Sequence, residues 1–213
     1  MATPTSAAPS PAAYDEYVSD PARPVPYTPR PVRFSDGDAW RRWLVADQRG
    51  VDGRTDVLSY EMAPLTEPLR VSGPPVVHLI ASTSGSDTDW VVKLIDVYPD
   101  EVASQPEMGG YELSIATDIF RGRYRESFEH PQAITPNTPL PYTFALPTVN
   151  HVFKPGHRIM VQVQSSLFPL YDRNPQTFVP NIFCAKAADY KAATQSVFTG
   201  GNNASAVYLP IVP

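Results

Sequence analysis

The sequence lacks features that disulfide-bonded, membrane-spanning and secreted proteins have. Its 213 residues include one cysteine, Cys184, so no internal disulfide can form. Cys184 lies in an apolar stretch, where we expect a small buried side chain. No apolar run approaches the ~20 residues of a membrane span. The N-terminus lacks the basic and apolar regions of a secretory signal. No membrane association is therefore predicted, and the compartment is left open with the cytoplasm as the default expectation.

Charged residues are also scarce. They make up 18% of the chain, below the ~25% typical of soluble domains. The net charge is −5, and lysines and arginines form no cluster. Because nucleic-acid binding usually needs a concentrated basic patch, no nucleic-acid partner is expected.

Proline, by contrast, is in excess, with 25 of the 213 residues. Proline is excluded from helix interiors and central strands, so its excess predicts many loops and few long helices. The first 13 residues predict a disordered tail. Residues 14–56 predict an extended arm and loop that pack on a surface of the protein, with a short helix over 38–46.

From residue 57 to the end, the pattern is typical of strands. The predicted strands cover 57–62, 75–82, 89–98, 111–127, 141–146, 158–165, 197–198 and 206–212. In the segment 158–165, Ile159, Val161 and Val163 alternate with polar residues, which places them on one face. Breaks rich in glycine and proline separate the runs. Many strands with little helix predict an all-β fold, an antiparallel β-sandwich or jelly roll spanning 57–213.

Catalytic motifs are absent from the sequence. The G-x-S-x-G elbow of α/β-hydrolases does not occur, and no β-α-β alternation is present to support it. His78 lies within a predicted strand, where a structural role is favoured. His151 and His157 lie six residues apart without the further ligands that a zinc site needs. We therefore expect no catalytic residue, no metal and no cofactor in this chain.

Two aspartates, Asp87 and Asp89, precede and begin a predicted strand. They could form a carboxylate pair for acid–base chemistry or calcium binding. Alternatively, they begin the strand and accept hydrogen bonds from backbone N–H groups or from an arginine. The second interpretation is favoured, since no complete calcium loop is present.

Three arginines alternate in the predicted strand 111–127, where this spacing puts them on one strand face: Arg121, Arg123 and Arg125. They could bind an anion. The favoured alternative is that they pair with local carboxylates, namely Asp87, Asp89 or Asp172.

The segment 166–174 combines aromatic and polar residues. Asp172, Arg173 and Asn174 precede a proline in the form of a turn held by side-chain to backbone bonds. The same segment could supply an aromatic platform for a sugar. Four aromatic residues are candidates either for an exposed apolar patch or for ordinary burial: Trp40, Trp43, Phe168 and Tyr171.

Several stretches, taken together and in this order, resemble one known family. They are YVSDP at 17–21, DQR at 47–49, DVLSY at 56–60, SDTDWVVKLIDVYP at 86–99, RGRYRES at 121–127, FKPGHRI at 153–159 and SSLFPLYDRNP at 165–175. The family is the X-Pro dipeptidyl-peptidase, cocaine esterase and α-amino-acid ester hydrolase group, and the resemblance is to its C-terminal, non-catalytic domain.

The resemblance implies a jelly-roll β-sandwich similar to galactose-binding-like domains, with a proline-rich N-terminal arm. In this family the domain follows an α/β-hydrolase domain that carries the Ser, Asp and His of the triad, and none of these has a matching position here. The resemblance therefore implies an accessory domain that packs on the hydrolase domain, borders it, and is inactive alone. The chain would then be part of a longer enzyme, a truncated gene or half of a split enzyme.

The complete enzyme would hydrolyse an ester, an α-amino acyl amide or an Xaa-Pro peptide. Ten residues are structural or interface candidates: Asp87, Asp89, Trp90, Arg123, Arg125, Phe168, Tyr171, Asp172, Arg173 and Asn174. The alternative is a free-standing module that binds a carbohydrate or a protein.

Overall fold

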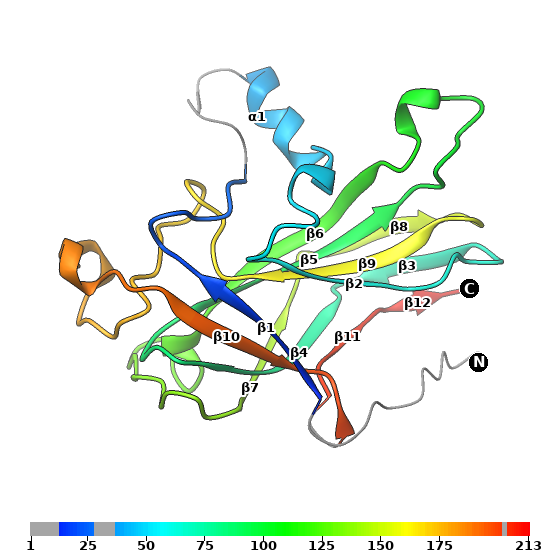
Figure 1. The fold of residues 1–213 in the computed structure, drawn as a ribbon. Coiled ribbons are helices and arrows are strands. Elements are labelled where there is room, and N and C mark those ends of the chain that lie inside the picture. The colour runs from blue at the N-terminus through cyan, green and yellow to red at the C-terminus, as the bar shows by residue number, and fades with distance from the viewer. Residues whose placement is uncertain (1–12, 28–36, 202–203) are drawn as a thin grey trace.

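The computed structural model describes residues 13–27, 37–201 and 204–213 (Figure 1). The strands are β1 Tyr14–Ser19, β2 Leu58–Glu61, β3 Leu69–Gly73, β4 Val76–Thr83, β5 Asp89–Val97, β6 Glu112–Arg121, β7 Leu140–Ala145, β8 Val149–Phe153, β9 Arg158–Gln164, β10 Ala193–Phe198, β11 Ala206–Tyr208 and β12 Ile211–Val212. The helices are α1 Gly37–Leu44 and the 3-10 turns η1 Gln48–Gly50, η2 Pro106–Met108, η3 Gly122–Tyr124, η4 Ile182–Cys184 and η5 Ala187–Asp189. The predicted disordered tail, residues 1–13, lies outside the described residues except for Ala13.

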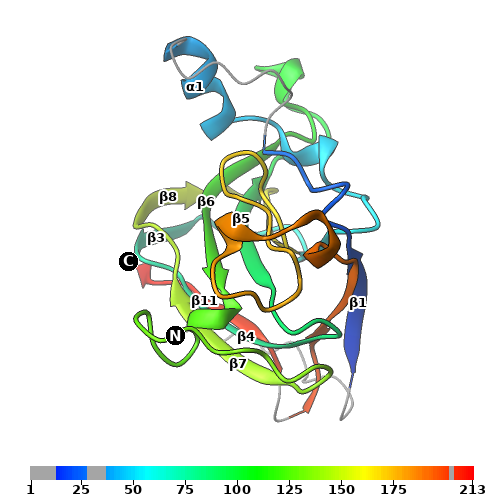
Figure 2. The same cartoon turned by 90° about the vertical axis from the view of Figure 1, so that its left-hand side faces the viewer.

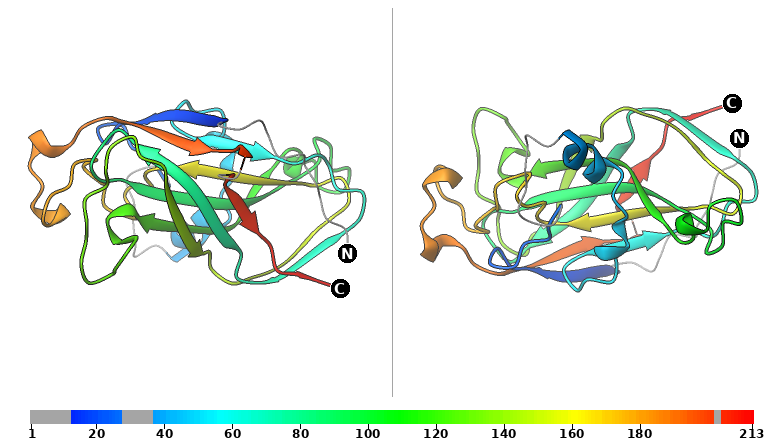
Figure 3. Two further views of the ribbon diagram at one scale, coloured as in Figure 1. Left: turned by 90° about the horizontal axis from the view of Figure 1, so that it is seen from below. Right: turned by 90° about the horizontal axis from the view of Figure 1, so that it is seen from above.

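The strands pair in a nested order. β2 pairs with β9, β3 with β8, β4 with β7 and β5 with β6, all antiparallel. Such nesting is a long hairpin rolled up on itself, which is the connectivity of a jelly roll. One sheet has the order β2-β9-β5-β6, and another contains β1-β10-β4-β11 with β7 beside β4. The sheets curl around one another (Figures 1 and 3). The prediction of an all-β sandwich is confirmed.

The core lies between the sheets. Along β5, Trp90, Val92 and Leu94 point into it and are completely or almost completely buried. Partners from other strands include Leu79 and Phe153. Each such side chain contributes about 1.5–3 kcal/mol by leaving water. The alternation of apolar residues along the strands thus becomes one continuous core.

The other face of β5 is buried as well. Tyr27 and Trp43 pack edge to face over Val91, with ring centroids 5.1 Å apart. Lys93 on the same face is buried, and its Nζ donates to Gln48 Oε1 at 2.8 Å. Residues 20–27, 43–51 and 165–171 supply this cover. The polar positions of β9 are enclosed for the same reason: Gln162 and Gln164 are fully buried.

The structure differs from the predicted strand 111–127. β6 ends at Arg121, and the chain turns through η3. A Cβ atom on Gly122 would lie 2.7 Å from Ile134 Cδ1, so glycine allows the close approach that this turn needs. The prediction that Arg121, Arg123 and Arg125 share one strand face is therefore wrong.

The helix and several strands differ from what the sequence predicted. The short helix expected over 38–46 is α1, although it begins at Gly37 and ends at Leu44. Strands β3 and β8, which pair with each other, were not predicted. Residues 14–19, expected to belong to the arm, form strand β1 at the edge of a sheet. The division of the chain at residue 57 stays a prediction. Within the described ranges, no helix is long and apolar enough to cross a membrane.

Candidate functional site

Part of the predicted site residues lie at the end of the sandwich where β5 begins and β6 ends. These strands are antiparallel, and Asp89 lies directly opposite Arg121 in their register. The first residue of one strand therefore meets the last residue of the other. Asp87 lies two residues before β5 begins, and η3 carries Arg123 back toward it.

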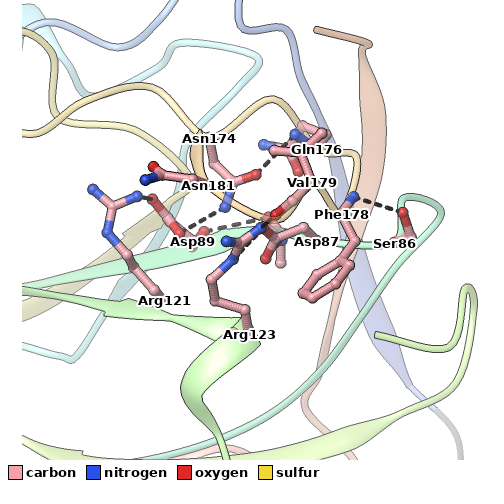
Figure 4. A network of polar contacts seen from close by, with 12 residues as sticks. Ser86, Asp87, Asp89, Arg121, Arg123, Asn174, Gln176, Phe178, Val179 and Asn181 are labelled. Carbon is pink, nitrogen blue, oxygen red and sulfur yellow. Dashed lines mark hydrogen bonds and ion pairs between the residues drawn. The ribbon is translucent and has the colours of Figure 1, made fainter. Parts of the chain in front are cut away.

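Two ion pairs result (Figure 4). Arg121 Nη1 lies 3.1 Å from Asp89 Oδ2. Arg123 Nε and Nη2 lie 2.8 and 2.7 Å from Asp87 Oδ2. The Asn174 amide donates to Asp89 Oδ1 at 2.9 Å. The expected pairing with Asp87 and Asp89 is confirmed for Arg121 and Arg123 but not for Arg125. Asp172 offers Arg121 only its backbone carbonyl, at 3.5 Å.

This buried polar network has its charges almost entirely out of water. Asp87 and Asp89 are 0% and 1% exposed. Burial raises the pKa of Asp89 to about 7, although the Arg121 guanidinium and the Asn174 amide act in the opposite direction. Burial also raises the pKa of Asp87, although the Arg123 guanidinium acts to lower it. Removing one partner would leave a buried charge uncompensated, at a cost of about 3–5 kcal/mol.

The network also anchors a loop, residues 174–181. Arg123 Nη2 donates to the carbonyl of Val179 at 2.8 Å. Its guanidinium lies over the ring of Phe178, 4.7 Å from the centroid. The backbone N–H of Phe178 in turn donates to Ser86 Oγ at 2.9 Å (Figure 4). One arginine thus joins the β6 end, the start of β5 and this distant loop.

Gln176 extends the network to the arm. It adopts a left-handed backbone conformation, with φ of 62°. Its N–H donates to Asn174 Oδ1 at 2.8 Å, which confirms the predicted side-chain to backbone bond in this turn. Its side chain donates to Ser19 Oγ and accepts from Gln195 Nε2. A glutamine is not a residue that sequence patterns single out, and Gln176 was missed.

Arg125 holds a second loop. Its Nη1 and Nη2 donate to the carbonyls of Gln132 and Ala133 at 3.1 and 2.8 Å. These bonds fix the end of the loop 122–133 next to Arg125, close to where β6 ends. The loops at 122–133 and 174–184 lie at the same end of the molecule (Figures 1 and 3).

The remaining candidates lie elsewhere. Trp90 is fully buried in the core, 5.5 Å from the ring of Tyr142. Arg173 lies over the ring of Phe168, 5.2 Å from its centroid, and its Nη1 donates to the carbonyl of Pro21 at 2.7 Å. Tyr171 packs on the buried cluster around Val91. Asp172 is exposed.

The aromatic candidates for an exposed patch are mostly covered. Trp43, Phe168 and Tyr171 are all half-buried, and the side chain of Trp40 lies outside the described part. The N–H of Val25 donates to Ser166 Oγ at 2.8 Å, and Pro26 bridges to Phe168. The arm therefore occupies the segment 166–174, which does not offer the open platform that a sugar would need.

The histidines have structural partners. His151 Nε2 and His157 Nδ1 each lie 2.8 Å from one oxygen of Asp96, which is 1% exposed. His78 Nδ1 lies 3.0 Å from Thr143 Oγ1. Over the ranges that the structure describes, no group of three or more His, Cys, Asp or Glu side chains could hold a metal ion.

Cys184 departs from its prediction. It is exposed in η4, not buried. The apolar residues around it gave the wrong expectation because η4 lies in a loop that projects from the sandwich (Figure 1). Its neighbour Phe183 is 78% exposed, and Phe128 in the other loop is 82% exposed. No sequence pattern marked these two rings.

A comparison with known proteins identifies the family of this chain. The family model for the X-Pro dipeptidyl-peptidase C-terminal non-catalytic domain matches residues 3–207. The chain belongs to this family. The family prediction from the sequence motifs is thereby confirmed.

Three relatives illustrate the match. A cocaine esterase of Rhodococcus sp. (strain MB1 Bresler) is 37% identical over 198 residues, which are 93% of this chain and 32% of the relative. The solved structure of an α-amino acid ester hydrolase is 65% identical, with a TM-score of 0.92, over 94% of this chain and 33% of that one. An aminopeptidase from the marine sediment archaeon Thaumarchaeota archaeon is 56% identical, with the same TM-score and the same two coverages. The chain thus spans about a third of the length of these relatives.

Proposed function

We propose that this domain is the accessory part of an acyl hydrolase whose catalytic residues lie in a separate α/β-hydrolase domain. The observation that carries the proposal is the shared coverage: the chain matches only a third of each relative, and the family description calls this third non-catalytic. The relatives are named for ester and peptide hydrolysis. Their common chemistry is attack on an acyl carbon with loss of an alcohol or an amine.

The described side chains support an accessory role. Nucleophilic catalysis needs a base within reach of the nucleophile and a third group that orients the base. Here His151 and His157 both contact Asp96, and His78 contacts Thr143. The two arginines of the buried polar network are neutralised by Asp87 and Asp89. The buried polar groups thus hold strands and loops together.

An accessory domain acts through its contacts. Domain interfaces within one chain typically bury about 600–1,500 Å². By packing against the catalytic domain, the sandwich would stabilise it and fix the loops that border its substrate cleft. The substrate would be an ester, an α-amino acyl amide or an Xaa-Pro peptide.

Complementation tests this proposal. The 213-residue chain is mixed with the catalytic part of the α-amino acid ester hydrolase relative, shortened to end where its similarity to this chain begins. We expect hydrolysis of an α-amino acid p-nitrophenyl ester to rise saturably with added chain, and the Tm of the catalytic part to rise with it. Heat-denatured chain is the control. Turnover by the isolated chain, or indifference of the catalytic part to added chain, would overturn the proposal.

A further inference from the structure

Two phenylalanines stand out on the surface of the described residues. Phe128 and Phe183 are 82% and 78% exposed, more than any other large apolar side chain there. They belong to the two loops that project from the same end of the sandwich (Figures 2 and 3). Single exposed apolar residues are ordinary, but adjacent ones mark interaction surfaces.

A hollow lies beside one of these rings, Phe183. It has a volume of about 280 Å³, and its walls include Tyr124, Ile182 and Phe183. Tyr124 also stacks on Phe128, with ring centroids 6.4 Å apart. Tyr124, Ile182 and Phe183 line the hollow, and Phe128 lies against Tyr124. We call the surface that these four residues form the loop-end surface.

The size of the hollow distinguishes between occupants. Sites for small molecules usually measure about 300–1,000 Å³ and enclose most of the ligand. A hollow of about 280 Å³ beside Phe183 fits one or two side chains better than a whole substrate. Its polar lining includes Arg121 and Arg123. Aromatic residues and arginine are the residue types enriched at protein interfaces.

Hydrogen bonds fix the backbone segments that carry the loop-end surface. Arg123 binds Asp87 and the carbonyl of Val179, as described above. The backbone N–H of Phe183 donates to Asn181 Oδ1 at 2.9 Å, which caps η4. A surface fixed before binding loses little conformational freedom on binding, and this favours affinity. The buried polar network thus fixes η3 and the loop that leads to Phe183.

We propose that the loop-end surface is where the catalytic domain docks, with an apolar side chain of that domain inserted into the hollow. The inference rests on the proposed function, because the relatives carry about two thirds of their length outside this domain. The Arg121 side chain is 21% exposed beside the hollow. A carbonyl or carboxylate next to the inserted side chain would complement it.

Binding measurements test the proposed surface. The 213-residue chain and its variants are titrated into the catalytic part of the α-amino acid ester hydrolase relative, and Kd is measured by calorimetry. Phe128→Ser with Phe183→Ser is expected to weaken binding by about 100-fold. Ile182→Trp, which keeps the surface apolar but fills the hollow, is expected to weaken it by about 10-fold or more.

The matched control is Tyr208→Ser. Tyr208 is 61% exposed on β11, so it is an exposed aromatic outside the loop-end surface. We expect its Kd to stay within about 3-fold of the unchanged chain, since exposed contacts outside an interface contribute little. Thermal melts of all variants check that the sandwich stays folded.

The outcomes separate the two proposals. If the unchanged chain does not bind, the proposed function fails, and the docking surface fails with it. If the unchanged chain binds and the double variant binds equally well, only the docking surface is wrong. Loss of binding in Tyr208→Ser alone would place the interface on the β11 edge and overturn the inference. Self-association of the chain that the double variant abolishes would assign the surface to a second copy, and would overturn it as well.

Discussion

The two ends of the β5–β6 pair bury carboxylates in opposite ways. At the loop end, Asp87 and Asp89 each meet an arginine. At the far end, Asp96 meets two imidazoles, and Glu112 Oε2 is buried without a hydrogen-bond partner among the described residues. Each buried carboxylate of the loop end thus has a guanidinium partner, whereas Asp96 at the far end has two imidazoles instead.

The difference follows from what each end must hold. Two long loops converge on the loop end, and a guanidinium can bond several groups at once. Arg123 uses this capacity to join Asp87 with the carbonyl of Val179. At the far end, the two imidazoles on Asp96 join strand β8 and the turn before β9 to β5. Asp47 also accepts from the backbone N–H of Glu112, which joins η1 to the start of β6. The buried ion pairs of the loop end therefore fix irregular backbone in addition to strands.

Arg123→Met is expected to have the largest effect, because it leaves Asp87 buried without a cation. We expect the free energy of unfolding to fall by about 3–5 kcal/mol in urea denaturation. The matched control is Arg23→Met, since Arg23 pairs with Asp20 but its side chain is 84% exposed. That control should lose less than about 1 kcal/mol.

A second variant tests the cause of this loss. Combining Arg123→Met with Asp87→Leu removes the uncompensated charge and should recover at least half of the loss, since apolar replacements of buried ion pairs are often neutral. If Arg123→Met costs no more than Arg23→Met, the loop end is not the compensated region described here.

Asp96→Ala is expected to come next. Both histidines lose the carboxylate that they contact at 2.8 Å. Because each is a hydrogen bond to a charged acceptor, we expect a loss of about 2–3 kcal/mol in the same denaturation experiment. His78→Phe is the control, since His78 is only half-buried and contacts a single hydroxyl. An equal loss in that control would contradict the role assigned to Asp96.

Glu112→Gln is expected to act in the opposite direction and to depend on pH. Burial and the neighbouring Asp52 and Asp47 raise the pKa of Glu112 from 4.5 to about 7. The folded chain thus keeps a proton that the unfolded chain loses near pH 4.5, so the stability contributed by Glu112 falls as the pH rises from 4.5 to 7. The variant has no titratable group at position 112, so this pH-dependent contribution disappears. It should match the unchanged chain near pH 4.5 and exceed it by about 1–2 kcal/mol at pH 8.

Lys93 limits this gain. The Glu112 carboxylate attracts Lys93, whose pKa burial lowers to about 8. Removing the carboxylate removes that attraction, so the expected gain is smaller than the pKa change of Glu112 alone would give. Urea denaturation at several pH values between 4.5 and 8 measures the difference between the variant and the unchanged chain. A difference independent of pH would show that Glu112 does not carry a raised pKa.

Sequence patterns predicted the regular parts of this molecule well. The alternation in β9 and the apolar run of β5 were recognised because their periods match a buried strand. Strands β3 and β8 were missed because each is only five residues long and contains polar residues. Their pairing is set by the nested connectivity of the whole sandwich, which no local window contains.

The polar network was predictable only in part. The alternation of the arginines and their opposite charge suggested that they pair with Asp87 and Asp89, and Arg121 and Arg123 do. The turn at Gly122 was not predicted, because it depends on packing against Ile134, so the three arginines were wrongly placed on one strand face. Gln176 and the two exposed rings could not be predicted, since their positions come from loops that the network itself fixes.

Cys184→Ser is expected to have the smallest effect, and it tests the outer rim of the loop end. The sequence-based interpretation of a buried thiol predicts a loss of about 1 kcal/mol or more, because a serine hydroxyl would need a buried partner. The exposed position in η4 instead predicts a change within about 0.5 kcal/mol. Titration with a chromophoric disulfide reagent gives a second readout, since an exposed thiol should react fully in the folded chain. A thiol that reacts only in urea would return Cys184 to the core and would place η4, with Phe183, against the sandwich.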